Sequence, residues 1–296
     1  MARILVTGGA GFIGGHLMQK LLDEGHTPVV IDNLSTGFKE NIPEGVTAYF
    51  EDCRDTDALK IAAQSCEFVY HLASTVGVEK VLKDPQACIK NVIESTQSVL
   101  NLGIPGMDFS TSEVYGKNLS ILSEDSDLVY SSKARWSYAV SKLITEWLVK
   151  AAGWKTVRLF NIVGPRQSLG YVFSNFIRQA RENRDLRVYG SGSQIRTFLD
   201  VRDAVDILSQ LREKTFDVVN VGGKHTMTVD CLAETIKTVT KSDSRIVHVP
   251  YRDAYSEGFE TSFEDCQARI PDLTRLHGLI GDYKYRPLEQ TMEDSW

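Results

Sequence analysis

Tyr138 and Lys142 lie four residues apart, and their side chains are the first candidates for chemistry in this chain. The pattern around them predicts a helix over Tyr138–Ala152, on which a spacing of four places both side chains on one face. Upstream, a β-like run ends on Thr111, and Glu113 follows two residues later. In an open parallel sheet, ligands bind beyond the carboxyl ends of the strands. We therefore expect a hydroxyl, a phenol and an ammonium to converge on one ligand, with an acid close by.

These side chains need a framework that brings a ligand to them, and the start of the chain has the pattern of one. An apolar run at Ile4–Thr7 enters a glycine-rich turn, which leads into a helical pattern over Phe12–Asp23. Gly8 permits the tight turn, Gly11 lets the backbone approach a pyrophosphate, and Gly14 lets the helix pack close to the strand. The helix start offers backbone N–H groups and a partial positive charge to phosphates. Strand, turn and helix together predict a dinucleotide site, with the nicotinamide beside Tyr138 and Lys142.

Asp32 indicates which dinucleotide is bound. It ends the second apolar run and lies eighteen residues beyond Gly14, close to the roughly twenty expected of a carboxylate that bonds the adenosine ribose hydroxyls. A 2′-phosphate would be repelled by this negative charge. We therefore expect NAD rather than NADP, unless a neighbouring cation reverses the preference.

The rest of the chain alternates between strand-like and helix-like segments. That alternation predicts an α/β fold, a Rossmann-type doubly wound parallel sheet with a smaller C-terminal substrate-binding lobe. We expect the NAD-binding domain over residues 1–165, with segments near 195–225 returning to it, and the lobe mainly over residues 166–296. Strands are expected at Ile4–Thr7, Pro28–Ile31, Ala48–Phe50, Phe68–Leu72, Met107–Thr111, Thr156–Phe160 and Val218–Val221, and further helices at Ile89–Leu102, Phe173–Arg184, Val201–Leu211 and Val229–Val239.

Composition excludes several classes of function. The net charge of -6 and the pI near 5.6 argue against a nucleic-acid partner, because phosphate binding favours a basic face. The chain enters a strand without a signal peptide and has no apolar stretch long enough to span a bilayer, so a cytoplasmic location without membrane attachment is expected. The five cysteines and six histidines lack metal-ligand spacing. We expect reduced thiols and no metal.

Taken together, the motifs resemble the extended short-chain dehydrogenase/reductase family, and within it the NAD-dependent nucleotide-sugar epimerases, dehydratases and decarboxylases. The resemblance covers nearly the whole chain. The motifs that carry it are residues 7–14 (TGGAGFIG), 32–37 (DNLSTG), 71–73 (HLA), 111–116 (TSEVYG), Tyr138 with Lys142, Asn161 through Gly164-Pro165-Arg166, and 189–196 (YGSGSQIR).

The resemblance implies a role for each residue at the reacting centre. Tyr138 would be the base that removes the proton of the sugar 4-hydroxyl while a hydride passes from C4 to NAD. A free phenol, with a pKa of about 10, is a poor base at neutral pH, so a nearby positive charge is needed. Lys142 would supply that charge and bond the nicotinamide ribose. Thr111 would hydrogen-bond the 4-oxygen.

The resemblance also implies contacts to the two ligands. On the substrate side, Asn161 and Arg196 match residues that contact the diphosphate, and Ser112 is a further candidate. A guanidinium binds phosphate oxygens in a fork, although a surface ion pair is the alternative for Arg196; Arg166 and Arg252 are weaker candidates. Expected cofactor contacts are Gly8, Gly11, Phe12, Ile13, Gly14, Asp32, Asn33, Ser35, Gly37, Asp52, Cys53, Leu72, Ala73, Asn91, Tyr138 and Lys142.

Glu113 separates the possible outcomes of a common first step. Dehydratases of the family commonly have Thr-Asp-Glu, whereas Ser112 stands in the middle here. Thr-Ser-Glu occurs in UDP-glucuronate decarboxylases and GDP-mannose dehydratases, and Arg135-Trp136 before Tyr138 resembles the decarboxylases. Simple 4-epimerases often have a small or uncharged residue at Glu113, whose alternative role is to cap a turn.

We expect a nucleotide sugar linked to UDP, and we rank its 4-epimerisation first as the commonest outcome in the family, decarboxylation next and 4,6-dehydration third. An alcohol dehydrogenase for a small ketone and a non-catalytic cofactor sensor remain as alternatives, since a fold does not determine a reaction. A homodimer through the long helices beside the sheet is usual in the family.

Overall fold

The computed structural model describes residues 1–75, 77–254 and 264–296. Contacts divide the chain into two compact units, each assembled from several segments. Unit 1 is Met1–Val114, Ser137–Leu159 and Val205–Val219, and unit 2 is Tyr115–Trp136, Phe160–Ala204 and Asn220–Trp296. The division at residue 165 into a cofactor domain and a substrate lobe stays a prediction.

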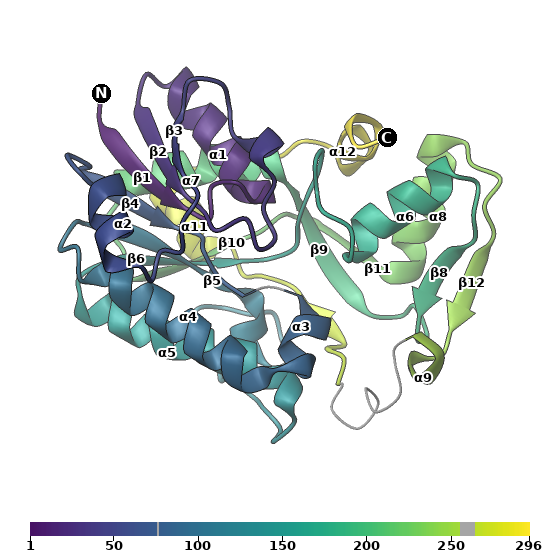
Figure 1. The fold of residues 1–296 in the computed structure, drawn as a ribbon. Helices are drawn as coiled ribbons and strands as arrows, with labels where there is room; N and C mark the ends of the chain where they lie inside the picture. The colour runs from purple at the N-terminus through teal and green to yellow at the C-terminus, as the bar shows by residue number, and fades with distance from the viewer. Residues whose placement is uncertain (76, 255–263) are drawn as a thin grey trace. The chain divides into compact units, whose positions relative to one another are not determined.

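A seven-stranded sheet forms the centre of the first part of the chain (Figure 1), with the strand order β10-β6-β5-β4-β1-β2-β3. The neighbours from β3 to β6 pair in parallel, and their order is that of a dinucleotide-binding sheet. The predicted Rossmann-type fold is confirmed. The strands are β1 (Arg3–Thr7), β2 (Thr27–Ile31), β3 (Thr47–Tyr49), β4 (Phe68–His71), β5 (Gly106–Thr111), β6 (Lys155–Leu159) and β10 (Val218–Val221).

Helices cover both faces of this sheet, which is why its central strands are apolar on both sides. Leu5 packs into a cluster with Leu59, Val99 and Val149, which places α2, α4 and α5 on one face, while α1 lies on the other (Figure 1). The segments are α1 (Phe12–Asp23), η1 (Lys39–Asn41), α2 (Thr56–Ala62), α3 (Val78–Lys83), α4 (Pro85–Leu100), η2 (Ser112–Tyr115), η3 (Ala134–Trp136), α5 (Ser137–Ala151) and α7 (Val201–Arg212).

Two of these helices depart from the sequence expectation because of their caps. Helix α4 begins four residues before Ile89, since Asp84 accepts a hydrogen bond from the Ala87 amide and Pro85 occupies the first helical turn. Helix α2 was not expected, and Asp55 caps it by accepting from the amides of Asp57 and Ala58, the second and third residues of the helix. Caps at these positions extend a helix beyond its apolar periodicity.

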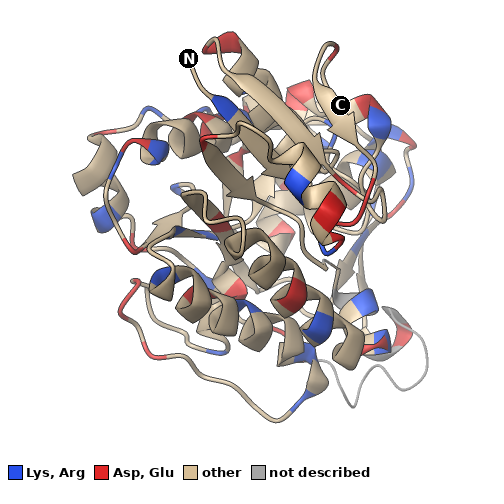
Figure 2. Cartoon of the chain, turned by 60° about the vertical axis from the view of Figure 1, so that its left-hand side comes forward, with Lys and Arg blue, Asp and Glu red and all other residues tan. Residues whose placement is uncertain are grey.

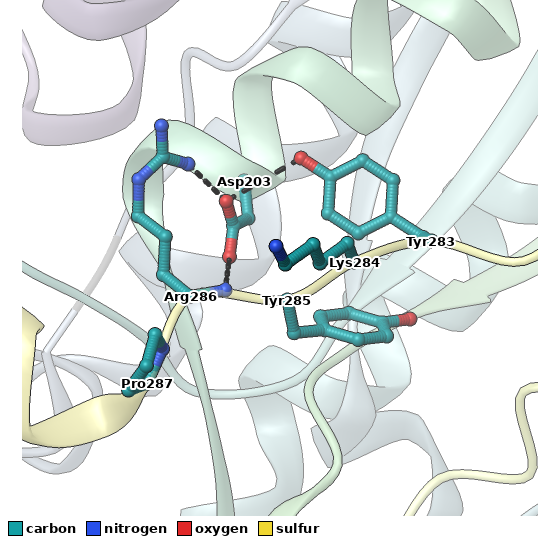
Figure 3. A pocket seen from close by; sticks show the side chains of 6 residues that line it. All are labelled: Asp203, Tyr283, Lys284, Tyr285, Arg286 and Pro287. Atoms are coloured by element: carbon teal, nitrogen blue, oxygen red, sulfur yellow. Dashed lines mark hydrogen bonds and ion pairs between the residues drawn. The ribbon is translucent and has the colours of Figure 1, made fainter.

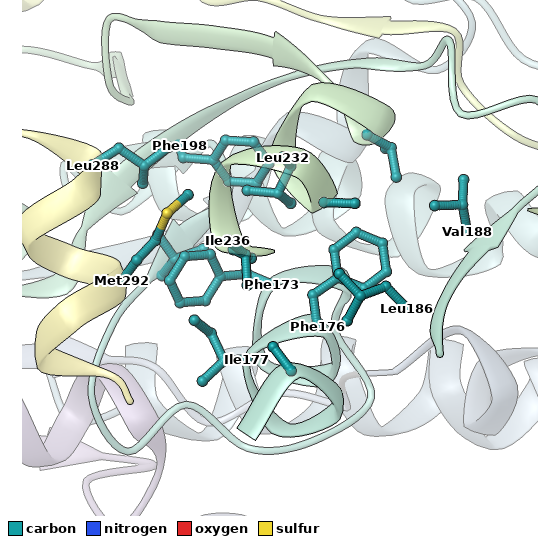
Figure 4. Packing of buried hydrophobic residues seen from close by; sticks show 14 residues of the cluster. Phe173, Phe176, Ile177, Leu186, Val188, Phe198, Leu232, Ile236, Leu288 and Met292 are labelled. Atoms are coloured by element: carbon teal, nitrogen blue, oxygen red, sulfur yellow. The ribbon is translucent and has the colours of Figure 1, made fainter. Parts of the chain in front are cut away.

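Unit 2 has its own core, made by helices packed on short strands (Figure 4). Phe173 and Phe176 of α6 pack with Leu232 and Ile236 of α8 and with Met292 of α12. None of the strands named below was expected, since runs of two to six residues carry little periodic signal. The elements are β7 (Ile162–Val163), α6 (Val172–Arg181), β8 (Leu186–Tyr189), β9 (Ile195–Asp200), β11 (His225–Thr228), α8 (Val229–Thr240), β12 (Ile246–Val249), α9 (Tyr251–Ala254), β13 (Ala268–Arg269), α11 (Thr274–Ile280) and α12 (Leu288–Asp294).

Charged residues of both signs are mixed along the elements seen in Figure 2, without a separate basic face in that view. Among residues 1–75, 77–254 and 264–296, none of the helices has the length and apolar character that a bilayer crossing requires. The same residues contain no group of three or more His, Cys, Asp or Glu arranged to hold a metal ion.

Candidate active site

The glycine turn between β1 and α1 has the close approaches that the motif predicts. Gly8 has a φ of +72°, and a Cβ there would lie 2.7 Å from the Ala73 amide nitrogen. A Cβ on Gly14 would lie 2.5 Å from the Gly8 carbonyl oxygen. The Gly11 amide donates to that same carbonyl at 3.1 Å. These positions therefore exclude side chains because the turn, the helix start and the end of β4 are packed together.

The N-terminus of α1 fits the pyrophosphate of a dinucleotide. Gly11 is the N-cap and provides no side-chain cap, and the first turn, which contains Phe12 and Ile13, has no acidic residue. The first amides of a helix need an acceptor from outside it, and the helix dipole makes that acceptor preferably an anion. The residues present thus fit a bound phosphate group.

Asp32 directly follows β2 and is held by one backbone amide of the glycine turn and one of the loop after it. Its Oδ2 accepts from the Ala10 amide at 2.9 Å and its Oδ1 from the Leu34 amide at 2.8 Å. Burial raises the pKa of Asp32, and these two hydrogen bonds oppose the rise. Each carboxylate oxygen keeps acceptor capacity for a ribose hydroxyl. The expected role of Asp32 stays a prediction that this geometry supports.

A hydrogen-bonded chain connects three of the expected cofactor residues through one that the sequence reasoning missed. Asn33 donates to Asp52 at 3.0 Å, the Arg54 guanidinium bonds both oxygens of Asp52, and Arg54 also donates to Asn91 at 2.5 Å. Arg54 lowers the pKa of Asp52 to about 2. The sequence feature that could have pointed to Arg54 is its position two residues after Asp52, to which its charge is bonded.

Cys53 is another expected cofactor residue. Burial raises the pKa of the Cys53 thiol to about 12, so this thiol stays neutral.

The loop after Asp32 packs directly on the glycine turn. The Ser35 amide donates to the Asn33 side chain at 3.0 Å, and a Cβ on Gly37 would lie 2.8 Å from Ala10. Gly37 is therefore needed for packing, and that packing brings residues 33–37 to the turn.

His71 organises the end of β4, where Leu72 and Ala73 begin. Thr7 Oγ1 lies 2.8 Å from His71 Nδ1, and Thr96 Oγ1 lies 3.2 Å from Nε2. Since the Thr96 hydroxyl donates to the Val92 carbonyl, its oxygen accepts from Nε2, and the Thr7 hydroxyl donates to Nδ1. Full burial lowers the pKa of this imidazole to about 3. His71 is thus a neutral hydrogen-bonding bridge between β1, β4 and α4.

Thr111, Glu113, Tyr138 and Lys142 all belong to unit 1. Thr111 ends β5, and its hydroxyl accepts from the Glu113 amide at 3.2 Å, so both residues belong to one turn. Tyr138 is half-buried near the start of α5 and packs against Val81, Cys88 and Val92. Lys142, one turn later, is buried, with its Nζ 3.4 Å from Asp108 Oδ1. Asp108 was also missed, because a lone acid in an apolar strand shows no partner in the sequence.

Two of the expected substrate residues, Asn161 and Arg196, are close together in unit 2. Asn161 donates to the Thr197 carbonyl at 2.9 Å, which places it beside Arg196 of β9. The Arg196 guanidinium forms an ion pair with Asp265 at 3.1 Å. An ion pair was the alternative to phosphate binding for Arg196, but this pair is not on the open surface, since both side chains are only 17% exposed. Ser112 is buried, Arg166 has a φ of +66°, and the Arg252 side chain lies outside the described residues.

A shallow pocket of about 320 Å³ in unit 2 contains none of these residues (Figure 3). Asp203 is held there by the backbone amide and the guanidinium of Arg286 and by the Tyr283 hydroxyl. Since neighbours already bond its acidic group, we assign this pocket no ligand.

Comparison with known proteins agrees with this geometry. The sequence model of the NAD dependent epimerase/dehydratase family matches residues 4–222. The chain is 35% identical over 312 residues to a UDP-N-acetyl-alpha-D-glucosaminuronate decarboxylase of Bacillus cytotoxicus, with 99% of this chain and 96% of the relative covered.

Two solved structures have nearly the same fold over 99% of this chain and 97% of theirs. One is a UDP-glucose 4-epimerase of Thermotoga maritima with UDP-glucose, with a TM-score of 0.88 and 26% identity. The other is a UDP-glucuronic acid 4-epimerase of Bacillus cereus with UDP-glucuronic acid and NAD, with a TM-score of 0.87 and 26% identity. On these matches, the chain belongs to the NAD-dependent epimerase/dehydratase family, and NAD is its cofactor.

Proposed function

We propose that this protein oxidises a UDP-linked sugar at C4 with NAD, and that the sugar is a uronic acid which the protein decarboxylates. The observation that best supports the oxidation at C4 is that one unit carries the glycine turn, Asp32 and the set Thr111, Tyr138 and Lys142. The groups proposed to bind the dinucleotide and those proposed to transfer the proton thus belong to one unit.

Residues of the glycine turn and Asp32 would hold NAD, which supplies the hydride acceptor when bound. Tyr138 would take the proton of the 4-hydroxyl, and the Lys142 ammonium would favour the phenolate. Thr111 would hold the 4-oxygen by a hydrogen bond. Asn161 and Arg196 would bind the diphosphate, with Ser112 near the sugar.

What two of the matched proteins share supports the proposed substrate class. The decarboxylase relative and the Bacillus cereus structure are both named for a UDP-linked uronic acid. Oxidation of such a sugar at C4 makes a β-keto acid, whose C5–C6 bond breaks as its electron pair moves into the C4 carbonyl. Carbon dioxide leaves, C5 takes up a proton, and the hydride returns to C4. Glu113, in the turn of Thr111, is the candidate donor of that proton.

Epimerisation at C4 is the second candidate, which the sequence placed first. It uses the same opening step, after which the 4-keto sugar rotates in the site and the hydride returns to the other face of C4. The epimerase structures favour it. The decarboxylase relative and Glu113 favour decarboxylation.

The deciding experiment incubates the purified protein and NAD with UDP-glucuronate, UDP-N-acetylglucosaminuronate and UDP-glucose, and with dTDP- and GDP-sugars. Product mass and sugar NMR are recorded. Loss of carbon dioxide from a uronate supports the proposal, whereas unchanged mass with an inverted C4 supports the epimerase. Loss of water would identify a dehydratase. Turnover of none of these sugars, or steady accumulation of NADH, would overturn both candidates. Tyr138→Phe serves as the inactive control.

We also propose a homodimer through α4 and α5. Val140, Ile144 and Trp147 recur at helical spacing on α5, and Trp147 is 64% exposed. Ile89 of α4 is also exposed, and α4 packs on α5. An apolar stripe on paired helices fits a second copy of itself. Trp147→Glu is expected to convert a dimer into a monomer in light scattering; a wild-type monomer would contradict this.

A further inference from the structure

Lys142 is held in the interior of unit 1 by an acid that no motif contains. Its side chain is 1% exposed, that of Asp108 is not exposed at all, and Nζ lies 3.4 Å from Asp108 Oδ1. Asp108 comes from the middle of β5, three residues before Thr111. The charge that the proposed function requires of Lys142 is therefore buried together with one opposite charge.

The surroundings show that the other charges nearby are paired among themselves. Glu146, one turn after Lys142, forms an ion pair with Arg158 of β6 at 2.7 Å and accepts from Ser110 at 2.5 Å. On β4, burial lowers the pKa of His71 to about 3, so this imidazole is neutral. From α4, Cys88 presents a thiol whose pKa burial raises to about 11.

Strand and helix periodicity explain how these partners meet. Asp108 and Ser110 are two apart on β5 and therefore point to the same face. Lys142 and Glu146 are four apart on α5 and lie one turn from each other on the facing side. Asp108 therefore lies opposite Lys142, and Ser110 lies opposite Glu146. Tyr138 is one turn before Lys142 on the same stripe.

We propose that Asp108 is a positioning residue, which holds the Lys142 ammonium in its charged form and aims it at the cofactor ribose and the Tyr138 phenol. The inference rests on the proposed role of Lys142. A lysine buried without a counter-charge is driven toward its neutral form, and a neutral amine would neither stabilise a phenolate nor bind the ribose as strongly. Asp108 Oδ2 is buried without a hydrogen-bond partner among the described residues, so Lys142 is the main partner of this carboxyl.

The charge of Asp108 should also make NAD affinity depend on pH. Burial raises the pKa of Asp108, against the opposing attraction of Lys142 and its hydrogen bond. Asp108 therefore takes up a proton at a higher pH than an ordinary aspartate as the solution is acidified. Protonation removes the partner of Lys142, so NAD affinity should fall with it. Asp32 also has a raised pKa, so its protonation contributes to the same fall in NAD affinity. Comparison of the wild type with Asp108→Asn isolates the part of the fall that is due to Asp108.

The test measures NAD affinity by calorimetry between about pH 8 and pH 5, the range in which buried carboxyls titrate. Asp108→Asn keeps the shape and removes the charge. At the upper end of this pH range we expect Asp108→Asn to bind NAD about tenfold more weakly than the wild type, as loss of a hydrogen bond to a charged group implies. On acidification, its NAD affinity should fall less than that of the wild type. Asp108→Glu, which keeps the charge, should recover part of the affinity.

Asp217→Asn is the matched control, because Asp217 pairs at 2.9 Å with Lys150 of the same helix, but both side chains are 67% exposed. It should bind NAD as the wild type does at each pH. If Asp108→Asn does not fold, Asp108→Ser takes its place with the same expectation. Wild-type affinity and pH profile in the neutral variant would overturn the inference. If Lys142→Ala also binds NAD normally, the proposed function fails as well; if Lys142→Ala is weak, only the role of Asp108 fails.

Discussion

Replacing Gly14 by alanine tests whether the contact between α1 and the glycine turn makes the cofactor site. Alanine in a helix is normally more stable than glycine by about 1 kcal/mol. At this position, however, a Cβ would lie 2.5 Å from the Gly8 carbonyl oxygen and 2.6 Å from the Gly9 Cα, both of which are backbone atoms. The propensity gain and the steric clash therefore act in opposite directions.

The displacement can be worked out from these distances. Contacts of a Cβ below 3.0 Å essentially do not occur, so the helix start must move by at least 0.5 Å, the difference between 3.0 and 2.5 Å. Overpacking of this kind costs about 1–3 kcal/mol, which leaves a net loss of about 1 kcal/mol. For a chain of 296 residues, that lowers Tm by about 2 °C at ~2 cal/mol/K per residue. A 1 Å misplacement in an active site can lower the reaction rate about a hundredfold, and we expect a shift of half that size at the helix start to weaken NAD binding about tenfold.

Gly278→Ala provides the matched control. Gly278 lies in α11, and a Cβ there has nothing within 4 Å, so the same exchange should raise Tm by about 1–2 °C and leave NAD affinity unchanged. Calorimetry gives the affinity and thermal unfolding gives Tm. A Gly14→Ala protein that is stabilised like the control and binds NAD like the wild type would refute the steric reasoning.

Three further predictions follow from the site. Tyr138→Phe should lower turnover by about 10²–10⁴-fold, as for the loss of a general base, with NAD affinity within about twofold in a binding titration; a variant with full turnover would exclude Tyr138 as the base. Asp32→Ala should weaken NAD and admit NADP, because the charge that repels a 2′-phosphate is lost; unchanged selectivity between the cofactors would contradict this. The pKa of Asp52 is lowered to about 2 in the folded chain, so its contribution to stability is complete above its unfolded value of about 3.9 and is lost as pH falls toward 2; denaturant midpoints of wild type and Asp52→Asn should therefore converge on acidification, and a constant difference would exclude the ion pair as its cause.

Much of the fold could be predicted from the sequence because the pattern is local. A parallel strand buried on both faces is a continuous apolar run, and α1 and β10 were predicted with their observed bounds. The strands of unit 2 were mostly missed, because β8 and β11 are four residues long and owe their existence to partners distant in the chain. Short strands are stabilised by pairing rather than by their own periodicity.

The chemical types of the side chains at the site can be read from residue type and spacing. Gly8 and Gly14 could be recognised because a backbone that passes so close to other backbone tolerates no Cβ, and Tyr138 and Lys142 because four residues make about one helical turn. The tertiary structure alone decided which charges meet. Asp108 faces Lys142, Arg54 joins Asp52 to Asn91, and Asp265 pairs with Arg196. Such pairs are set by strand order and helix packing across tens of residues, and the strength of an electrostatic interaction depends on distance and burial, which spacing along a chain does not contain.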